Sequence, residues 1–166
     1  MRDIRTFDEF YGVTGRRVVA QVYAMIGDLA EAEDAVQEAY SRAWQRWDTV
    51  AECTDPAAWV RVVAYRIAVS NWRRARRRLA AYQRNGPPTA APELGPDTVV
   101  LVAALRRIPA AQRRAIVLHH LAGLSVREVA EETGASESAV KAQLSRGRQA
   151  LAVLLNDEHQ EVGRHG

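Results

Sequence analysis

Residues 123–148, GLSVREVAEETGASESAVKAQLSRGR, decide how the C-terminal half of this chain folds. Ser125 and Glu128 have the spacing of a capping box, in which each side chain accepts a hydrogen bond from the other residue's backbone N–H. Gly134 suits the left-handed backbone that ends a helix, and Ser136 offers the N-cap of the next helix. The stretch therefore predicts a helix-turn-helix, which is two short helices joined by a tight turn.

The two predicted helices have a shared apolar seam and a polar outer side. The seam consists of Leu124, Val129, Ala130, Val140 and Leu144. The outward arcs of the second helix carry Lys141, Gln143, Ser145, Arg146 and Arg148. A basic helix held at a fixed angle is what reading of the DNA major groove requires. Any short pair of amphipathic helices has similar capping signals. On these residues alone, a DNA-binding motif and an ordinary helical pair therefore both stay open.

The composition narrows the class of protein. A chain of 166 residues with 48% hydrophobic residues fits one domain or two small helical ones. The single cysteine, Cys53, excludes an internal disulfide and a zinc site built on several cysteines. No segment approaches the ~20 apolar residues that span a bilayer, and no signal peptide opens the chain, so we expect a soluble, cytoplasmic protein.

Hydrophobic periodicity predicts an all-α fold, because apolar residues recur every three or four positions and no stretch alternates as a strand does. The predicted parts are a first domain over 1–81, a flexible Pro/Gly-rich linker over 82–96, a second domain containing the helix-turn-helix over 97–156, and a disordered tail over 157–166. In the second domain Asp97 is the expected N-cap of one helix, and Pro109 begins another that ends before Gly123.

The first domain is expected to hold three helices, at about 6–26, 28–47 and 57–79, with the stretch Thr49–Asp55 as a loop. Asp28 can cap the second helix, with Glu31 completing a capping box. This helix has five acids and no base between Asp28 and Glu38. The helix dipole favours acids in the first turn but does not reach Glu38. From the pattern alone, a solvated acidic face and a partner-binding face both stay open.

The third predicted helix has an apolar side that runs from Trp59 to Trp72, and it is strongly basic. Between Pro56 and Pro92 there is no acid, and the arginines there are Arg61, Arg66, Arg73, Arg74, Arg76, Arg77, Arg78 and Arg84. The base composition of a genome can also produce a general arginine bias. The clustering of the arginines is therefore better evidence of a binding surface than the formal net charge of +3. The helix dipole favours arginines only in the last turn of a helix, so it does not account for a stretch of this length with charges of one sign. The stretch therefore predicts a polyanionic partner.

Motifs of catalysis are missing from the sequence. There is no glycine-rich phosphate loop, no HExxH and no GxSxG. The neighbouring His119 and His120 are expected to point in different directions on a helix, so they do not share a metal. We expect no enzyme activity, no metal site and no cofactor.

The order of these features resembles one protein family. The acidic helix GDLAEAEDAVQEAYSRAW, the arginine helix AAWVRVVAYRIAVSNWRRARRR, the linker and the helix-turn-helix are similar to bacterial extracytoplasmic-function (ECF) RNA polymerase sigma factors of the actinobacterial sigma-E-like type. The resemblance implies a factor that binds core polymerase and directs promoter recognition and transcription initiation. The alternatives are a free-standing helix-turn-helix regulator and an interaction module whose basic helix binds an acidic protein. The acidic face beside the arginine helix favours the sigma factor, because a simple repressor needs neither.

The resemblance also implies roles for particular residues. Asp34, Gln37 and Glu38 would dock on the β′ clamp helices of core polymerase, and the second domain would meet the β flap. The candidates for recognising and melting the minus-ten element are Thr49, Cys53, Trp59, Arg61, Arg66, Arg73, Arg74 and Arg77. The candidates for the minus-thirty-five element are Ser136, Lys141, Ala142, Gln143, Ser145, Arg146 and Arg148, with Arg148 assigned to backbone phosphate. An anti-sigma factor is an implied partner, whereas a membrane and a small-molecule substrate are not.

Four positions depart from the family pattern. Arg66 and Ser70 stand where the family often has Asn and Asp. Gly147 replaces a common alanine, at a cost of roughly 1 kcal/mol inside a helix. Ala142 offers a base only apolar contact, for example to a thymine methyl group. Promoter preference is therefore not inherited from relatives.

Overall fold

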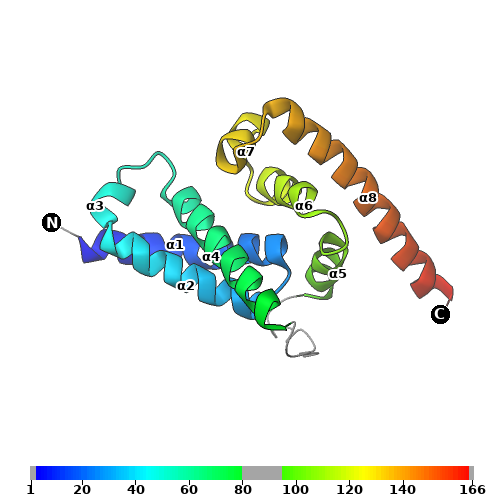
Figure 1. The fold of residues 1–166 in the computed structure, drawn as a ribbon, viewed down its shortest axis with the longest axis horizontal. Helices are drawn as coiled ribbons and strands as arrows, with labels where there is room; N and C mark the ends of the chain where they lie inside the picture. The colour runs from blue at the N-terminus through cyan, green and yellow to red at the C-terminus, as the bar shows by residue number, and fades with distance from the viewer. Residues whose placement is uncertain (1–2, 80–94, 165–166) are drawn as a thin grey trace. The chain divides into compact units, whose positions relative to one another are not determined.

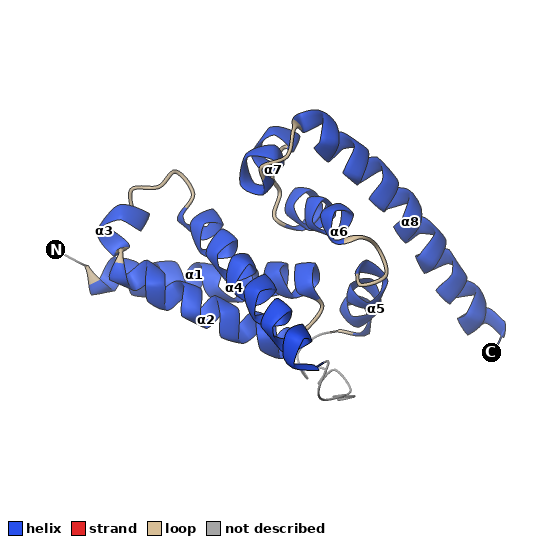
Figure 2. Ribbon diagram, in the orientation of Figure 1, coloured by secondary structure: helices blue, strands red, loops and turns tan. Residues whose placement is uncertain are grey.

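The structure, a computed structural model, describes residues 3–79 and 95–164. Every regular element in these ranges is helical (Figures 1 and 2), as the sequence predicts. The elements are α1 (Ile4–Ile26), α2 (Leu29–Gln45), α3 (Trp47–Val50), α4 (Pro56–Leu79), α5 (Pro96–Leu105), α6 (Ala110–Ile116), the π-helix η1 (Val117–Leu121), α7 (Val126–Thr133) and α8 (Glu137–Arg164). They form two compact units, divided after Ala91. Most of the predicted linker lies outside the described residues.

The first unit is a bundle of α1, α2 and α4 with a core of small side chains. Its buried alanines are Ala24 on α1, Ala32, Ala35, Ala39 and Ala43 on α2, and Ala57, Ala64 and Ala68 on α4. A methyl side chain lets two helix backbones come close together, and α2 and α4 share the most extensive contact of any two helices in this unit. Val18, Val22 and Val60 fill the remaining space without exposure to solvent.

An aromatic cluster closes one end of this bundle. Phe7 and Phe10 of α1 lie 5.2 and 5.1 Å, between ring centroids, from Trp47. The sequence places Trp47 within the second helix, but α2 ends at Gln45 and Trp47 begins α3. Its ring is buried, and its Nε1 donates a hydrogen bond to Thr6 Oγ1 at 3.0 Å.

A buried hydrogen-bond chain joins α1 and α2 beside the cluster. The Thr14 hydroxyl donates to the carbonyl oxygen of Phe10 at 2.6 Å, so the Tyr40 hydroxyl is the donor in its 2.7 Å contact with Thr14 Oγ1. Burial raises the pKa of Tyr40 above its ordinary value, because the phenolate would lose its hydration. Tyr40 therefore stays protonated and keeps its donor role at neutral pH.

The turn between α1 and α2 follows the sequence prediction with one difference. Gly27 ends α1 in the left-handed conformation, with φ of 79°, and Asp28 Oδ1 accepts a hydrogen bond from the backbone N–H of Glu31. The carboxylate of Glu31, which is expected to close a capping box, instead accepts from Asn71 Nδ2 of α4 at 3.0 Å. This bond ties the start of α2 to the C-terminal part of α4.

The expected inward side of α4 is wrong at its end. Trp72 is 56% exposed, although its spacing continues the apolar stripe. Asn71 already contacts the first turn of α2, so the residues that follow run past the end of that helix and have no core to enter.

The second unit packs α6 and α7 against α8. Leu105, Val117 and Leu118 are fully buried in its core. The helix that begins after Pro109 does not stay α-helical to Leu121, because its last turn widens into η1, where the N–H of Ala122 bonds to the carbonyl of Val117. Gly95 and Pro96 begin α5, so Asp97 lies in the first turn and is not the N-cap.

The last helix is longer than the sequence predicts. It continues to Arg164, so residues 157–164, expected in a disordered tail, are helical. Figure 1 shows this C-terminal part of α8 running on beyond α6 and α7. The apolar pattern ends at Leu155, and a helix that has left its core gives no periodic signal.

Gly147 is explained by close packing between helices. A Cβ at this position would overlap the end of the Ile116 side chain and would lie 3.3 Å from Gln112 Cβ, both on the helix that α8 crosses. Gly147 and Ile116 are buried, so the end of the Ile116 side chain would have to shift within the core to make room for a Cβ. Glycine at this position lets α6 and α8 approach, and this gain offsets its poor helix propensity.

We predict that Gly147→Ala destabilises the second unit by about 1 kcal/mol, because overpacking of roughly 1–3 kcal/mol outweighs a propensity gain of about 1 kcal/mol. Urea unfolding followed by circular dichroism measures the change. The matched control is Gly12→Ala in the middle of α1, where nothing lies within 4 Å of the new Cβ, and it should raise stability. If both variants were stabilised alike, the close approach of α6 and α8 would not constrain position 147.

Candidate functional site

The helix-turn-helix forms as the sequence predicts. Ser125 Oγ accepts from the N–H of Glu128, and Glu128 Oε1 accepts from the N–H of Ser125, both at 3.1 Å. The backbone N–H of Ser125, and after it the Ser125 side chain, hold the pKa of Glu128 below its ordinary value, because they stabilise the carboxylate. Gly134 ends α7 with φ of 74°, and Ser136 Oγ accepts from the N–H of Ala139 to cap α8.

The predicted apolar seam is also present. Its five members are Leu124, Val129, Ala130, Val140 and Leu144, and all are buried. They fix the angle between α7 and α8, which leaves one side of α8 to solvent. Lys141, Ser145, Arg146 and Arg148 are exposed on that helix, whereas Ala142 and Gln143 are half-buried. All the candidates for the minus-thirty-five element thus lie in the N-terminal half of α8 or at its cap.

The two neighbouring histidines do not point apart, contrary to the sequence prediction. Their ring centroids are 4.8 Å from each other in an edge-on arrangement, because η1 is a π-helix and turns less per residue than an α-helix. His119 Nδ1 lies 2.7 Å from the carbonyl oxygen of Leu124, so this nitrogen carries the hydrogen. Among the described residues no three potential metal ligands are grouped together.

His120 contacts a residue that the sequence assigns to DNA binding. The Nε of Arg148 donates a hydrogen bond to His120 Nε2 at 3.1 Å. The two residues are 28 positions apart on different helices, so no local sequence signal could have shown the contact. Burial, first of all, and then the nearby His119 and Arg148 lower the pKa of His120 below its ordinary value, which favours the neutral ring.

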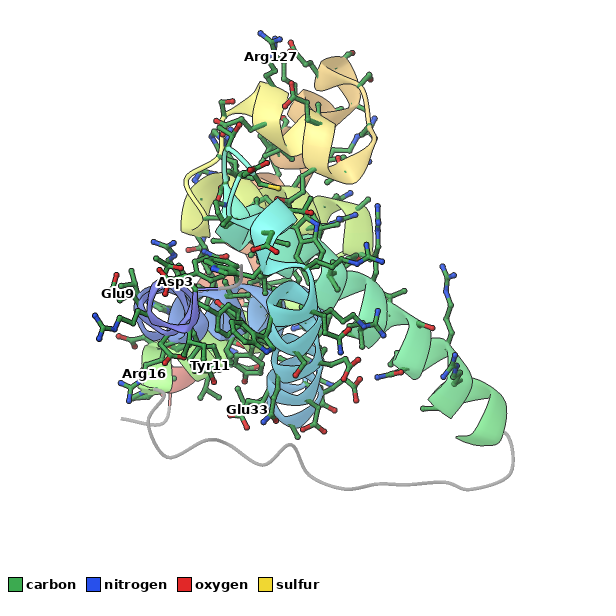
Figure 3. All side chains as sticks on the ribbon, turned by 90° about the vertical axis from the view of Figure 1, so that its left-hand side faces the viewer. Asp3, Glu9, Tyr11, Arg16, Glu33 and Arg127 are labelled. Atoms are coloured by element: carbon green, nitrogen blue, oxygen red, sulfur yellow. The ribbon has the colours of Figure 1, made fainter. Side chains whose placement is uncertain are left out.

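In the first unit the acidic side chains lie on the outside of α2. Asp34, Gln37 and Glu38 are exposed, and the buried alanines occupy the other side of the helix. Figure 3 shows the neighbouring Glu33 pointing away from the α2 ribbon. Glu38 pairs with Arg42 at 3.1 Å, but an exposed pair four residues apart on a helix contributes only about 0.3–0.5 kcal/mol. A stronger partner can therefore displace Arg42.

The segment between α3 and α4 is shorter than expected. Thr49 belongs to α3, so the loop comprises residues 51–55. Cys53 Sγ donates to the carbonyl oxygen of Thr49 at 3.7 Å, and Asp55 Oδ1 accepts from the N–H of Ala58 at the start of α4. The loop is thus held at both ends, with Cys53 half-buried between them.

The arginines of α4 do not share one environment. Arg66, Arg73 and Arg74 are exposed, as DNA contacts should be, and Trp59 is half-buried. Arg61 is only 3% exposed, and its Nη1 donates to Gln21 Oε1 of α1 at 3.0 Å. The expectation that Arg61 contacts DNA is therefore corrected: it lies on the side of α4 that packs in the bundle. The side chain of Arg77 lies outside the described residues.

None of the helices in the described part of the chain is both long and apolar enough to span a bilayer.

Comparison with protein families matches both units. The model for sigma-70 region 2 matches residues 10–78, and the model for sigma-70 region 4 matches residues 98–151. The first match covers the acidic helix and the arginine helix, and the second covers the helix-turn-helix. A free-standing helix-turn-helix regulator is not favoured, because it does not account for the first unit.

Curated relatives define the class more closely. The ECF RNA polymerase sigma factor SigJ of Mycobacterium tuberculosis is 34% identical over 149 residues, which cover 82% of this chain and 47% of SigJ. The ECF RNA polymerase sigma factor SigL of the same species is 31% identical over 140 residues, which cover 80% of this chain and 79% of SigL. This chain belongs to the ECF RNA polymerase sigma factors. It spans about half the length of SigJ.

Solved structures agree with this assignment. The crystal structure of SigJ matches with a TM-score of 0.59 at 31% identity, covering 87% of this chain and 52% of that one. The sigma factor RpoE of Bartonella quintana, solved in complex with the anti-sigma factor NepR, matches with a TM-score of 0.79. That match covers 92% of this chain and 98% of RpoE at 23% identity, so it shows a shared fold.

We predict that Arg61→Ala lowers the stability of the first unit by about 2–4 kcal/mol, because it removes a buried side chain and leaves Gln21 Oε1 without its hydrogen bond. The measurement is urea unfolding of the full chain. Arg66→Ala on the same helix is the control, and since Arg66 is exposed its effect should stay within about 0.5 kcal/mol. Equal stability of the two variants would contradict the structural role of Arg61.

Proposed function

We propose that this protein acts in the cytoplasm as an alternative sigma factor, which brings core RNA polymerase to a specific set of promoters and initiates transcription there. The observation that carries the proposal is the presence, in one chain, of an exposed acidic face on α2, an arginine-rich α4 and a helix-turn-helix. The factor binds and opens DNA and performs no bond chemistry of its own.

The acidic face of α2 is the proposed docking surface for core polymerase. Asp34, Gln37 and Glu38 would bind the β′ clamp helices, and the second unit would contact the β flap. Exposed carboxylates on a rigid helix steer a basic partner and set its register. Because the small buried residues of α2 face the bundle, binding at this surface requires no rearrangement of the core.

The loop 51–55 and α4 are the proposed site of minus-ten recognition and melting. The loop that would receive a flipped base contains Cys53 and follows Thr49 of α3. Trp59 and the exposed Arg66, Arg73 and Arg74 come from α4. Unstacking a base costs about a few kcal/mol, and stacking on an aromatic ring returns about 1–3 kcal/mol per base. Exposed arginines along the same helix would follow the backbone of the opened strand.

The proposed reader of the minus-thirty-five element is α8. Polar contacts to bases or phosphates would come from Ser136, Lys141, Gln143, Ser145 and Arg146. Ala142 would make only apolar contact, and Arg148 would bind backbone phosphate.

An anti-sigma protein is the proposed regulator. RpoE was solved with the anti-sigma factor NepR, and CnrH, which matches with a TM-score of 0.65 at 22% identity over 93% of this chain and 90% of its own, was solved with the cytosolic domain of CnrY. We extend this mode of control to the present chain by analogy of fold.

Run-off transcription with purified core polymerase tests the proposed function. Genomic fragments from the source organism are the templates, and the expected result is initiation at a distinct subset of them that depends on this protein. Failure to direct initiation from any fragment would refute the proposal. Sequence-specific binding without core polymerase would then support the free-standing regulator.

We predict that Asp34→Arg and Glu38→Arg each weaken binding to core polymerase about tenfold or more, because juxtaposed like charges cost several kcal/mol at an interface. Fluorescence anisotropy of the labelled protein with core polymerase measures the affinity. Glu9→Arg is the matched control, since Glu9 is an exposed acid on α1 that points away from α2 (Figure 3). Loss of DNA binding by the same variants would indicate misfolding and count against the docking role.

We predict that Arg146→Ala costs about 1–3 kcal/mol at a single promoter position if Arg146 reads a base. Binding to a set of promoters with single substitutions measures this. A uniform loss over all sequences, with a shallower dependence on salt, would assign Arg146 to phosphate.

A further inference from the structure

The contact between His120 and Arg148 joins η1 to the proposed DNA-reading helix. Both side chains are exposed, and the bond runs from Arg148 Nε to His120 Nε2 at 3.1 Å. A guanidinium has five N–H groups, of which this bond uses one. The four N–H groups on Nη1 and Nη2 are left for other acceptors.

The histidine ring has support on its own helix. Its neighbour His119 contacts it edge-on at 4.8 Å between centroids, and His119 in turn donates to the carbonyl of Leu124 at 2.7 Å. Leu124 directly precedes Ser125, the N-cap of α7. The two histidines therefore connect the entry of α7 with Arg148 on α8, so the guanidinium is fixed relative to both helices of the motif.

The chemistry of the bond fixes the state of His120. An arginine Nε–H only donates, so His120 Nε2 must present a lone pair and the ring must be neutral. The lowered pKa of His120 agrees with this state at neutral pH.

We propose that His120 is a positioning residue for DNA binding: it holds Arg148 so that the two Nη groups face a phosphate of the DNA backbone. The proposal rests on the proposed function, because it takes α8 to be the DNA-reading helix. Arg148 follows Lys141 and Ser145 at steps of three and four residues, so all three lie on the same side of α8. A guanidinium that is already oriented loses less rotamer freedom when DNA binds.

The experiment measures DNA affinity of the full chain and its variants. The probe is a fluorescein-labelled duplex of mixed sequence and about 30 base pairs, titrated at several NaCl concentrations near pH 7.5, well above the ordinary histidine pKa of about 6.5. The variants are His120→Ala, Arg148→Ala, the double variant and His120→Gln. Glutamine is informative because its Oε1 reaches about as far as His Nε2 and accepts a hydrogen bond. His159→Ala is the control, since His159 is exposed near the end of α8.

We expect Arg148→Ala to weaken binding and to reduce the salt slope by about one. His120→Ala should weaken binding about threefold to tenfold, the range for freezing one long side chain, with the salt slope kept because the charge remains. The double variant should be no weaker than Arg148→Ala. His120→Gln should bind within about twofold of the unmodified protein, and His159→Ala should match it.

Three results would overturn the inference. An equal loss from His120→Ala with and without Arg148 would show that the histidine does not act through the arginine. Failure of His120→Gln to restore affinity would assign the ring a packing role. An unchanged DNA affinity of Arg148→Ala would show that Arg148 does not bind a phosphate. If transcription in the run-off assay still depended on the protein, the proposed function would stand without this inference.

Discussion

The alanine-lined contact between α2 and α4 is the constraint on which the first unit depends. Because most buried side chains of α2 and α4 are alanine methyl groups, the helices can pack closely, and little room is left for larger side chains between them. The acids of α2 and, among the described arginine side chains of α4, Arg66, Arg73 and Arg74 therefore lie on outer faces. Arg61 is the exception, since it faces α1 and is satisfied there by Gln21. Packing of small residues thus produces two charged surfaces on one small bundle.

In the second unit, backbone geometry determines which side of α8 faces solvent. Gly123 and Gly134 take positive φ angles at the two corners around α7, and Gly147 lets α8 approach α6. The capping box at Ser125 and Glu128 fixes where α7 begins. The glycines and the capping box together determine which side of α8 is exposed, and a small unit can do this without a large core. The widened turn of η1 adds a further link, because it brings two imidazole rings together beside the motif.

Features encoded locally were predictable from the sequence. The caps at Asp28, Ser125 and Ser136, the seam of the helix-turn-helix and the all-α class depend on residues a few positions apart. Features that depend on what a helix meets in space were not. Arg61 is buried because it faces Gln21 on α1, whereas Trp72 is exposed near the C-terminal end of α4. The bond from Arg148 to His120 spans two helices. The sigma-factor class could be inferred from the order of the parts, whereas the roles of single site residues remain proposals.

The exposed position of Lys141 has a chemical consequence. It is the chain's single lysine, and it lies in the N-terminal half of α8. Acylation of the lysine ε-amine thus has one target in this protein, and that target is on the helix proposed to read DNA. Such a modification would remove one positive charge from the recognition surface while leaving the arginines of both units unchanged. A dye coupled to the ε-amine would likewise report from a single, known place.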